Sequence, residues 1–210
     1  KKYKFFIILI ILLLFMASLV GCDAEIKEAG SIIKDDYKGE LIVHYIDVGQ
    51  GDSTFVQFPN GETSLIDGGT RGAREKVINY LKKLGIEKID YLIATHPHED
   101  HIGGLPEVIR TFSISQIYMP NKTANTKIFE EFLGEIQNKG LKINLAKGGD
   151  TIIDKGKLKF TILAPNRENY GETNDFSIVN KIQYMDTSFI FTGDAQKDSE
   201  MDMIDKNYDL

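Results

Sequence analysis

After residue 40 the chain alternates between short apolar runs and turn signals. The runs at residues 41–48, 53–58 and 63–67 have the β-rich composition of strands. Between the last two lies Pro59-Asn60-Gly61, which predicts a hairpin turn because an Asn-Gly pair tolerates positive φ. The domain is therefore expected to begin with antiparallel strands.

A helical period follows this β-rich start. Over residues 72–84 the apolar positions fall on one face, and Gly85 ends the pattern, which predicts an amphipathic helix. By the same criteria, further helices are expected at residues 105–112, 125–138 and 195–206. Further strands are expected at residues 90–95, 115–119, 141–146, 157–163, 177–184 and 188–191. Strands in meanders, interspersed with helices, predict an α+β layered fold with two sheets.

The first 22 residues have the pattern of a targeting segment. Three lysines among the first four residues precede an apolar run at 5–16, which is too short to span a membrane comfortably. Leu19-Val20-Gly21-Cys22 resembles the lipobox of bacterial lipoproteins, which implies lipidation of Cys22 and cleavage before it. We therefore expect an exported lipoprotein anchored on the outer side of the bacterial cytoplasmic membrane. The alternative is an uncleaved N-terminal anchor helix.

Composition and charge define the remaining organisation. Residues 23–40 are polar and predict a spacer, and residues 41–210 are expected to form one catalytic domain. The chain has 25 basic and 31 acidic residues, so non-specific binding to polyanions is not expected. A nucleic-acid role remains open, because bound metals with Arg71 and Arg74 could make a cleft locally positive. Cys22 is the single cysteine, so no internal disulfide can form.

The segment His96-Pro97-His98-Glu99-Asp100-His101 carries the strongest chemical signal. It directly follows an apolar strand, and it holds three of the four histidines in the chain. Neutral imidazoles and carboxylates are the ligands that zinc-class ions accept, and a strand end holds them in fixed directions. His96 and His98 point the same way if the backbone is extended, so that Asp100 and His101 reach a second position nearby.

Other carboxylates are weaker candidates. Asp194 follows an apolar strand at a Gly-Asp step, where one carboxylate could serve two metals, although such a step is often only a turn. Asp67 ends a strand before two glycines and is either a turn residue or a support beneath the metal loop. Asp47 and Asp52 flank a glycine-containing turn that lacks the ending of a phosphate-binding loop. His44, on the first strand, is interpreted as a packed or edge histidine.

These residues resemble the metallo-β-lactamase superfamily and, within it, the hydrolase domains of ComEC competence proteins. The resemblance rests on the H-x-H-x-D-H set, on residues 47–52, 67–69 and 174–179, and on Gly193-Asp194. It implies a four-layer αβ/βα sandwich with two zinc ions, or manganese, at one edge between the sheets. His96 and His98 would bind the first metal, Asp100 and His101 the second, and Asp194 would bridge. Asp100 and Asp194 are thereby the implied catalytic carboxylates.

Two departures from this family pattern stand out. The superfamily usually supplies another histidine to the first metal, but no histidine follows His101. Asn174 and Asp175 lie in that general region and are weak substitutes, with Asn174 as a possible supporting residue. ComEC-like proteins also continue into a later histidine-containing strand, whereas this sequence stops at Leu210. We therefore expect a hydrolase domain truncated at its C-terminus.

The chemistry expected of this set is hydrolysis by a metal-activated water. The resemblance implies a phosphodiester substrate, with DNA in competence-linked uptake as the example. Hydrolysis of a β-lactam or a thioester is the enzymatic alternative. A non-catalytic surface lipoprotein that keeps the fold is the third possibility. The sequence predicts a membrane contact through lipidated Cys22 but no protein partner.

Overall fold

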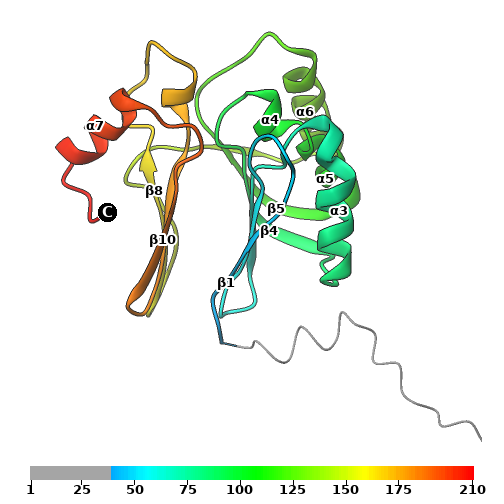
Figure 1. Cartoon of the computed structure of the whole chain (residues 1–210), viewed down its shortest axis with the longest axis horizontal. Helices are drawn as coiled ribbons and strands as arrows, with labels where there is room; N and C mark the ends of the chain where they lie inside the picture. The colour runs from blue at the N-terminus through cyan, green and yellow to red at the C-terminus, as the bar shows by residue number, and fades with distance from the viewer. Residues whose placement is uncertain (1–38) are drawn as a thin grey trace, which may run out of the picture.

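Two β-sheets face each other in the computed structural model, which describes residues 39–210 (Figure 1). The first sheet has the order β1 (Ile42–Tyr45), β2 (Thr54–Gln57), β3 (Thr63–Ile66), β4 (Lys88–Ile93), β5 (Ser113–Met119) and β6 (Ile143–Leu145). The second has the order β10 (Thr187–Phe191), β9 (Val179–Tyr184), β8 (Leu158–Ala164) and β7 (Thr151–Lys155).

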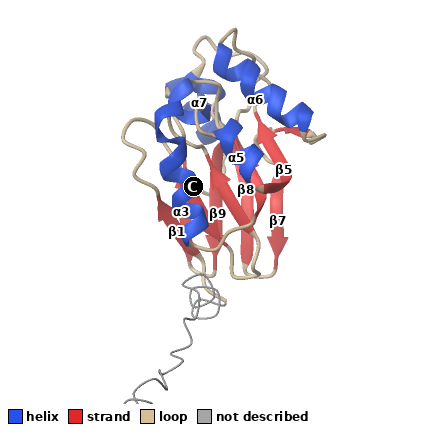
Figure 2. Cartoon of the chain, turned by 90° about the vertical axis from the view of Figure 1, so that its right-hand side faces the viewer, coloured by secondary structure: helices blue, strands red, loops and turns tan. Residues whose placement is uncertain are grey.

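Helices form the two outer layers. The helical segments of the described residues are α3 (Arg74–Lys83), α4 (Glu99–Ile102), α5 (Leu105–Thr111), α6 (Lys127–Asn138), α7 (Lys197–Asp205) and the 3₁₀ helices η1 (Arg71–Ala73) and η2 (Asn174–Phe176). Helices α3, α5 and α6 lie on the outer side of the first sheet, and α7 lies on the outer side of the second (Figure 1). Figure 2, turned by 90°, shows α3 and α5 in front of the strands. The expected αβ/βα sandwich is confirmed.

Alternation along the strands produces the separate cores between these layers. Phe55 and Leu92 both lie in the core beneath the helices of the first sheet. Their neighbours Val56 and Ile93 point the opposite way, into the core between the sheets. A smaller cluster around Met203 joins the second sheet to α7. The first sheet is therefore buried on both faces, which explains its nearly continuous apolar runs.

Strand direction determines where the loops gather. β1, β2 and β3 pair antiparallel, whereas β3 to β6 pair parallel. The predicted hairpin between β2 and β3 is confirmed, with Gly61 at φ 85°. Because β3 and β4 are parallel and adjacent, their carboxyl ends meet at one edge of the sheet, where the segments after them lie side by side.

Several sequence expectations about local structure were wrong. β7 was not predicted, because it is an edge strand in which only Ile153 is buried. The histidine-rich segment was expected to be a loop, yet its second half forms α4, which at four residues is too short to produce a helical period. The strand expected at 177–184 begins at Val179, after η2.

The predicted signal segment, the lipidation residue Cys22 and nearly all of the predicted spacer lie outside the described residues. Within residues 39–210, no helix is both long and apolar enough to cross a membrane.

Candidate metal centre

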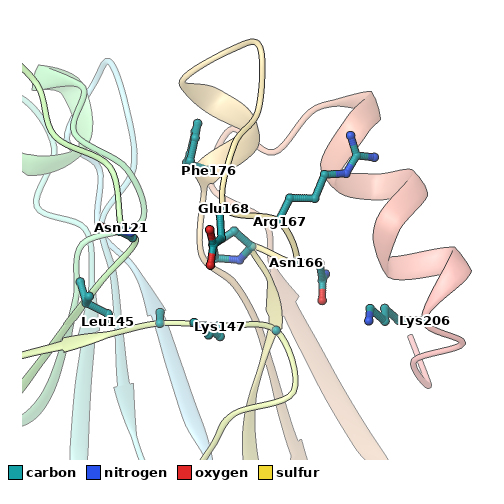
Figure 3. A pocket seen from close by; sticks show the side chains of 11 residues that line it. Asn121, Leu145, Lys147, Asn166, Arg167, Glu168, Phe176 and Lys206 are labelled. Carbon is teal, nitrogen blue, oxygen red and sulfur yellow. The ribbon is translucent and has the colours of Figure 1, made fainter.

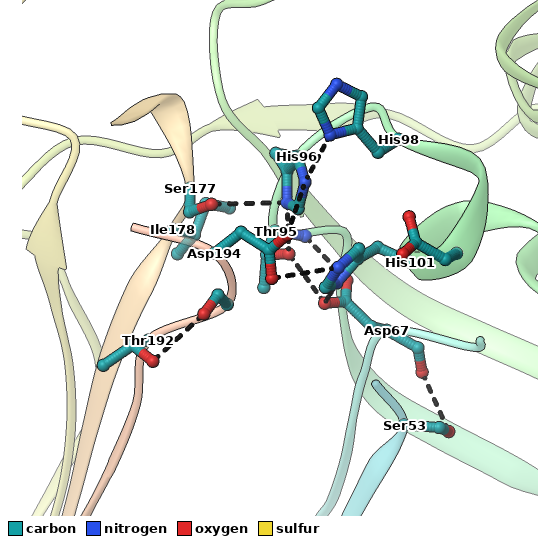
Figure 4. Close-up of polar contacts among 12 residues, drawn as sticks. Ser53, Asp67, Thr95, His96, His98, His101, Ser177, Ile178, Thr192 and Asp194 are labelled. Atoms are coloured by element: carbon teal, nitrogen blue, oxygen red, sulfur yellow. Dashed lines mark hydrogen bonds and ion pairs between the residues drawn. The ribbon is translucent and has the colours of Figure 1, made fainter. Parts of the chain in front are cut away.

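The polar cluster lies where the ends of strands from both sheets meet (Figure 4). Asp67 follows β3, and Thr95 and His96 follow β4. From the second sheet, Ser177 precedes β9 and Asp194 follows β10. A backbone hydrogen bond joins the two sheets here: the Ile178 amide donates to the Thr95 carbonyl at 2.9 Å. The site is therefore held by both sheets.

His96 is oriented through both of its ring nitrogens. Its Nδ1 lies 3.2 Å from Thr95 Oγ1 and 3.3 Å from Ser177 Oγ. Its Nε2 lies 3.0 Å from Nδ1 of His98. The ring of His96 is buried, at 1% exposure, whereas His98 is exposed. Because the two hydroxyls contact Nδ1 of His96, its Nε2 is directed toward His98.

Asp67 holds the second buried imidazole. Its Oδ2 lies 2.8 Å from Nδ1 of His101, and the same carboxylate accepts hydrogen bonds from the Thr95 amide at 2.8 Å and the Thr95 hydroxyl at 2.6 Å. Asp67 has no exposed surface. It therefore lies beneath the histidine segment and orients it from below.

Asp194 places one carboxylate oxygen near each buried imidazole. Oδ1 lies 3.2 Å from Nε2 of His101, and Oδ2 lies 3.8 Å from Nε2 of His96. One ligand atom from each of these three residues falls within a group whose members all lie within 4.8 Å of one another. Figure 4 shows Asp194 between the two rings.

The donor set fits divalent zinc-class ions. Two imidazole nitrogens and a carboxylate are typical ligands of such ions, and each buried imidazole already uses its other nitrogen for a hydrogen bond. A second group of this kind joins Asp52 and Asp67 to His101. There, however, the Asp67 oxygens are already hydrogen-bonded to Thr95 and His101. The first group is the better candidate.

The two buried histidines have opposite electrostatic environments. Burial lowers the pKa of His96 to about 3, and the neighbouring His101 and His98 contribute. Burial also disfavours charge on His101, but the hydrogen bond and charge of Asp67, together with Asp194, outweigh it and raise the pKa of His101 to about 9. His96 is therefore a neutral imidazole that can act as a metal ligand, whereas the carboxylates around His101 stabilise its protonated form.

Asp100 is held by the turn that follows β1. Gln50 Nε2 donates to Asp100 Oδ2 at 3.0 Å. Burial opposes ionisation, yet this bond and a backbone amide hold the pKa of Asp100 below its usual value. Gly51 lies against the same residue, because a Cβ there would come within 1.8 Å of the Asp100 carbonyl oxygen. Asp100 belongs to neither three-residue group among the described residues.

The remaining sequence candidates lie at different distances from this cluster. Asp52 lies at its rim, where burial raises its pKa and the Asp67 carboxylate adds to the effect, against the opposing charge of His101. Asp47 accepts a hydrogen bond from the Gly49 amide and so supports a turn. His44, on β1, contacts Tyr80 of α3 and Gln57 of β2, as expected of a packed histidine.

The two substitutes suggested for the missing histidine are in η2. Asp175 accepts hydrogen bonds from backbone amides at the start of α7. Asn174 has a buried Oδ1 with no hydrogen-bond partner among the described residues. No hydrogen bond or ion pair joins either side chain to the described histidines.

Sequence reasoning missed three residues that orient the cluster: Thr95, Ser177 and, as a partner of Asp100, Gln50. Thr95 stands next to His96 and could have been considered for that reason alone. Ser177 contacts His96 across 81 positions of sequence, so no local pattern carries that signal.

A cavity of about 380 Å³ opens beyond η2 (Figure 3). Three basic residues line it, namely Lys147, Arg167 and Lys206, together with one acidic residue, Glu168. Arg167 forms an ion pair with Asp202 on α7 at 2.6 Å. The positive charge that the cavity presents therefore comes from the two exposed lysines. Phe176, which lines the cavity, is the residue before Ser177 and so links it to the histidine cluster.

Comparison with known proteins agrees with this geometry. The model of the metallo-β-lactamase superfamily matches residues 46–210, and the chain belongs to this superfamily. It is 30% identical to ComE operon protein 3 of Bacillus subtilis over 179 residues, which cover 77% of this chain and 23% of that protein. It is 28% identical to ribonuclease Z of Archaeoglobus fulgidus over 131 residues, 60% of this chain and 40% of that enzyme. The chain thus spans less than half the length of these two relatives.

Solved structures show the same fold. A mutant metallo-β-lactamase from Cronobacter sakazakii aligns with a TM-score of 0.50 and 14% identity, over 74% of this chain and 64% of that one.

Proposed function

We propose that the chain is a metal-dependent hydrolase that cleaves phosphodiesters at a dinuclear site. The observation that carries the proposal is the position of Asp194, which directs one oxygen toward His96 at 3.8 Å and the other toward His101 at 3.2 Å. A carboxylate between two separately oriented imidazoles could serve two neighbouring cations.

The ligand roles follow from the sides on which the residues lie. His96 and His98, whose facing nitrogens are 3.0 Å apart, would hold one ion. His101 and Asp100, adjacent on α4, would hold the other, and Asp194 would contact both. Two divalent cations at these positions, zinc or manganese, would supply Lewis acidity and an activated water.

The protein's own contribution is preorganisation. Asp67 keeps Nε2 of His101 directed at Asp194, and the hydroxyls of Thr95 and Ser177 do the same for His96. Because these partners are buried, little reordering is needed on metal binding.

Two observations support a phosphodiester substrate over other electrophiles. One sequence relative is named as a ribonuclease, an enzyme that acts on a phosphodiester. In addition, the cavity beyond η2 exposes Lys147 and Lys206 although the chain as a whole carries a net charge of -6. These two positively charged lysine side chains would favour an anionic substrate.

The test is a substrate panel with the zinc- or manganese-loaded protein: bis(p-nitrophenyl) phosphate, an oligonucleotide, a chromogenic β-lactam and a thioester. We expect turnover of the first two, abolished in His96→Ala. Turnover of only the β-lactam or the thioester would reassign the substrate. Metal binding without turnover of any compound would support a non-catalytic role.

A further inference from the structure

Asp175 is a buried carboxylate whose two hydrogen bonds leave its own segment. It lies in η2, is 4% exposed, and its Oδ1 accepts from the backbone amides of Gln196 and Ser199, each at 3.1 Å. Gln196 is the N-cap residue of α7, and its own side chain makes no capping bond. Asp175 therefore caps α7 from a distant segment, where its negative charge also interacts favourably with the positive end of the helix dipole.

This cap lies two residues after Asp194. Directly before Asp194 in the chain is Gly193, which has φ 49° and packs closely on the site. A Cβ at Gly193 would lie 3.0 Å from Cβ of Thr95 and 3.3 Å from Cβ of Ser177. The backbone around Asp194 is thus fixed by packing before it and by Asp175 after it.

The same short segment also reaches the histidine side. Ser177, two residues after Asp175, places its hydroxyl 3.3 Å from Nδ1 of His96. One continuous stretch therefore contacts both the loop of Asp194 and the imidazole that faces it. A shift of this stretch would change the distance between Asp194 and His96 directly.

We propose that Asp175 is a positioning residue that sets the place of the Asp194 carboxylate between His96 and His101. The proposal rests on the proposed function, because it takes Asp194 to be the bridging ligand. Without the Asp175 carboxylate, the Gln196 and Ser199 amides lose their acceptor, the start of α7 loosens, and Asp194 pivots about Gly193.

The experiment compares Asp175→Ala with Asp175→Asn and with Met203→Ala. The asparagine retains an acceptor oxygen in the same place. Met203, 6% exposed beneath α7, is the matched control, because its truncation weakens the packing of the same helix without touching the cap. Each variant is loaded with Co²⁺ for its visible absorption spectrum, titrated with zinc against a chelator, and melted.

We expect Asp175→Ala to change the Co²⁺ spectrum and to lower zinc affinity by roughly 10–100-fold, as loss of an orienting partner does. Asp175→Asn should restore the spectrum and most of the affinity. Met203→Ala should lower the melting temperature and leave the spectrum unchanged. If the alanine variant does not fold, Asp175→Ser, which is polar but too short to reach both amides, replaces it.

A wild-type spectrum and affinity in Asp175→Ala would overturn the positioning role and leave the proposed function intact. The positioning role is also overturned if Met203→Ala loses as much zinc affinity as Asp175→Ala. Hydrogen exchange of the Gln196 and Ser199 amides, measured without metal, should be faster in Asp175→Ala and tests the cap itself. A wild-type protein that binds neither zinc nor cobalt would overturn the proposed function and, with it, the role of Asp175.

Discussion

The carboxylate of Asp67 lies 2.8 Å from Nδ1 of His101, with 0% and 1% of the two residues exposed. Asp67 adopts φ 59°, in the left-handed region that aspartate and asparagine tolerate better than other non-glycine residues. Its backbone conformation thus turns the chain after β3 while its side chain fixes the imidazole. This pair connects the fold of the first sheet to the candidate metal centre.

Asp67→Asn tests that connection. Asparagine accepts the same backbone conformation, so the fold should survive, but the carboxylate charge beside His101 is lost. Because such partners raise ligand basicity and fix the ring, we expect zinc affinity to fall about 10–100-fold. Chelator competition measures it. An affinity equal to that of the wild type would show that Asp67 has no part in metal binding.

Two glycines in the turn after β1 provide a matched pair. Gly49 and Gly51 both have φ 82°, but a Cβ at Gly49 meets nothing within 4 Å, whereas one at Gly51 meets the Asp100 carbonyl at 1.8 Å. Gly49→Ala should therefore cost only the conformational strain, about 1–2 kcal/mol. Gly51→Ala should add about 1–3 kcal/mol of overpacking and displace α4.

Denaturant unfolding gives the stabilities of these two variants, and zinc titration gives their affinities. We expect only Gly51→Ala to lose affinity, because only it moves the backbone of Asp100. Equal effects of the two alanines would show that the turn does not support the metal segment.

Two histidines offer a second comparison. His98 is exposed, and its Nδ1 faces Nε2 of His96 at 3.0 Å, whereas His44 is hydrogen-bonded to Tyr80 of α3 and Gln57 of β2. His98→Ala should remove one equivalent of bound metal with little change in stability. His44→Ala should leave the metal content unchanged and lower stability by about 1 kcal/mol. Elemental analysis after dialysis distinguishes them, and loss of metal in both would contradict the assignment.

The lysines of the cavity beyond η2 should contribute to binding of an oligonucleotide but not of a small phosphodiester. Lys147→Ala and Lys206→Ala should each weaken oligonucleotide binding and lower the slope of log affinity against log salt by about 0.9. Hydrolysis of bis(p-nitrophenyl) phosphate, which has no second phosphate for these lysines to contact, should not change. Lys157→Ala, an exposed lysine between β7 and β8, serves as the control. An unchanged salt slope in both cavity variants would show that these lysines do not contact the oligonucleotide.

Much of the fold was predictable because its signals are local. The β-rich run at residues 53–58, the Asn60-Gly61 turn and the helical period before Gly85 each depend on neighbours in sequence. The polar edge strand β7 gave no such signal, because a strand with a single buried residue has no amphipathic pattern.

The candidate site divides in the same way. His96, His98, Asp100 and His101 lie within six residues and were predicted from their spacing, and Asp194 from its Gly-Asp step. Of the residues that hold them, Asp67 was a candidate support, but Ser177 and Asp175 could not be found, because they act on segments that only the packing of the two sheets brings near. Asp175 was suggested as a substitute ligand, whereas its carboxylate faces the start of α7.

The most direct test of the dinuclear site is zinc binding to the wild-type protein and Asp194→Ala by isothermal titration, checked by elemental analysis. We predict two equivalents per chain in the wild type and weakened binding of both in Asp194→Ala, since a bridging carboxylate serves two ions. Loss of only one equivalent would make Asp194 a ligand of a single ion. A wild-type chain that binds no zinc and no manganese would contradict the dinuclear site altogether.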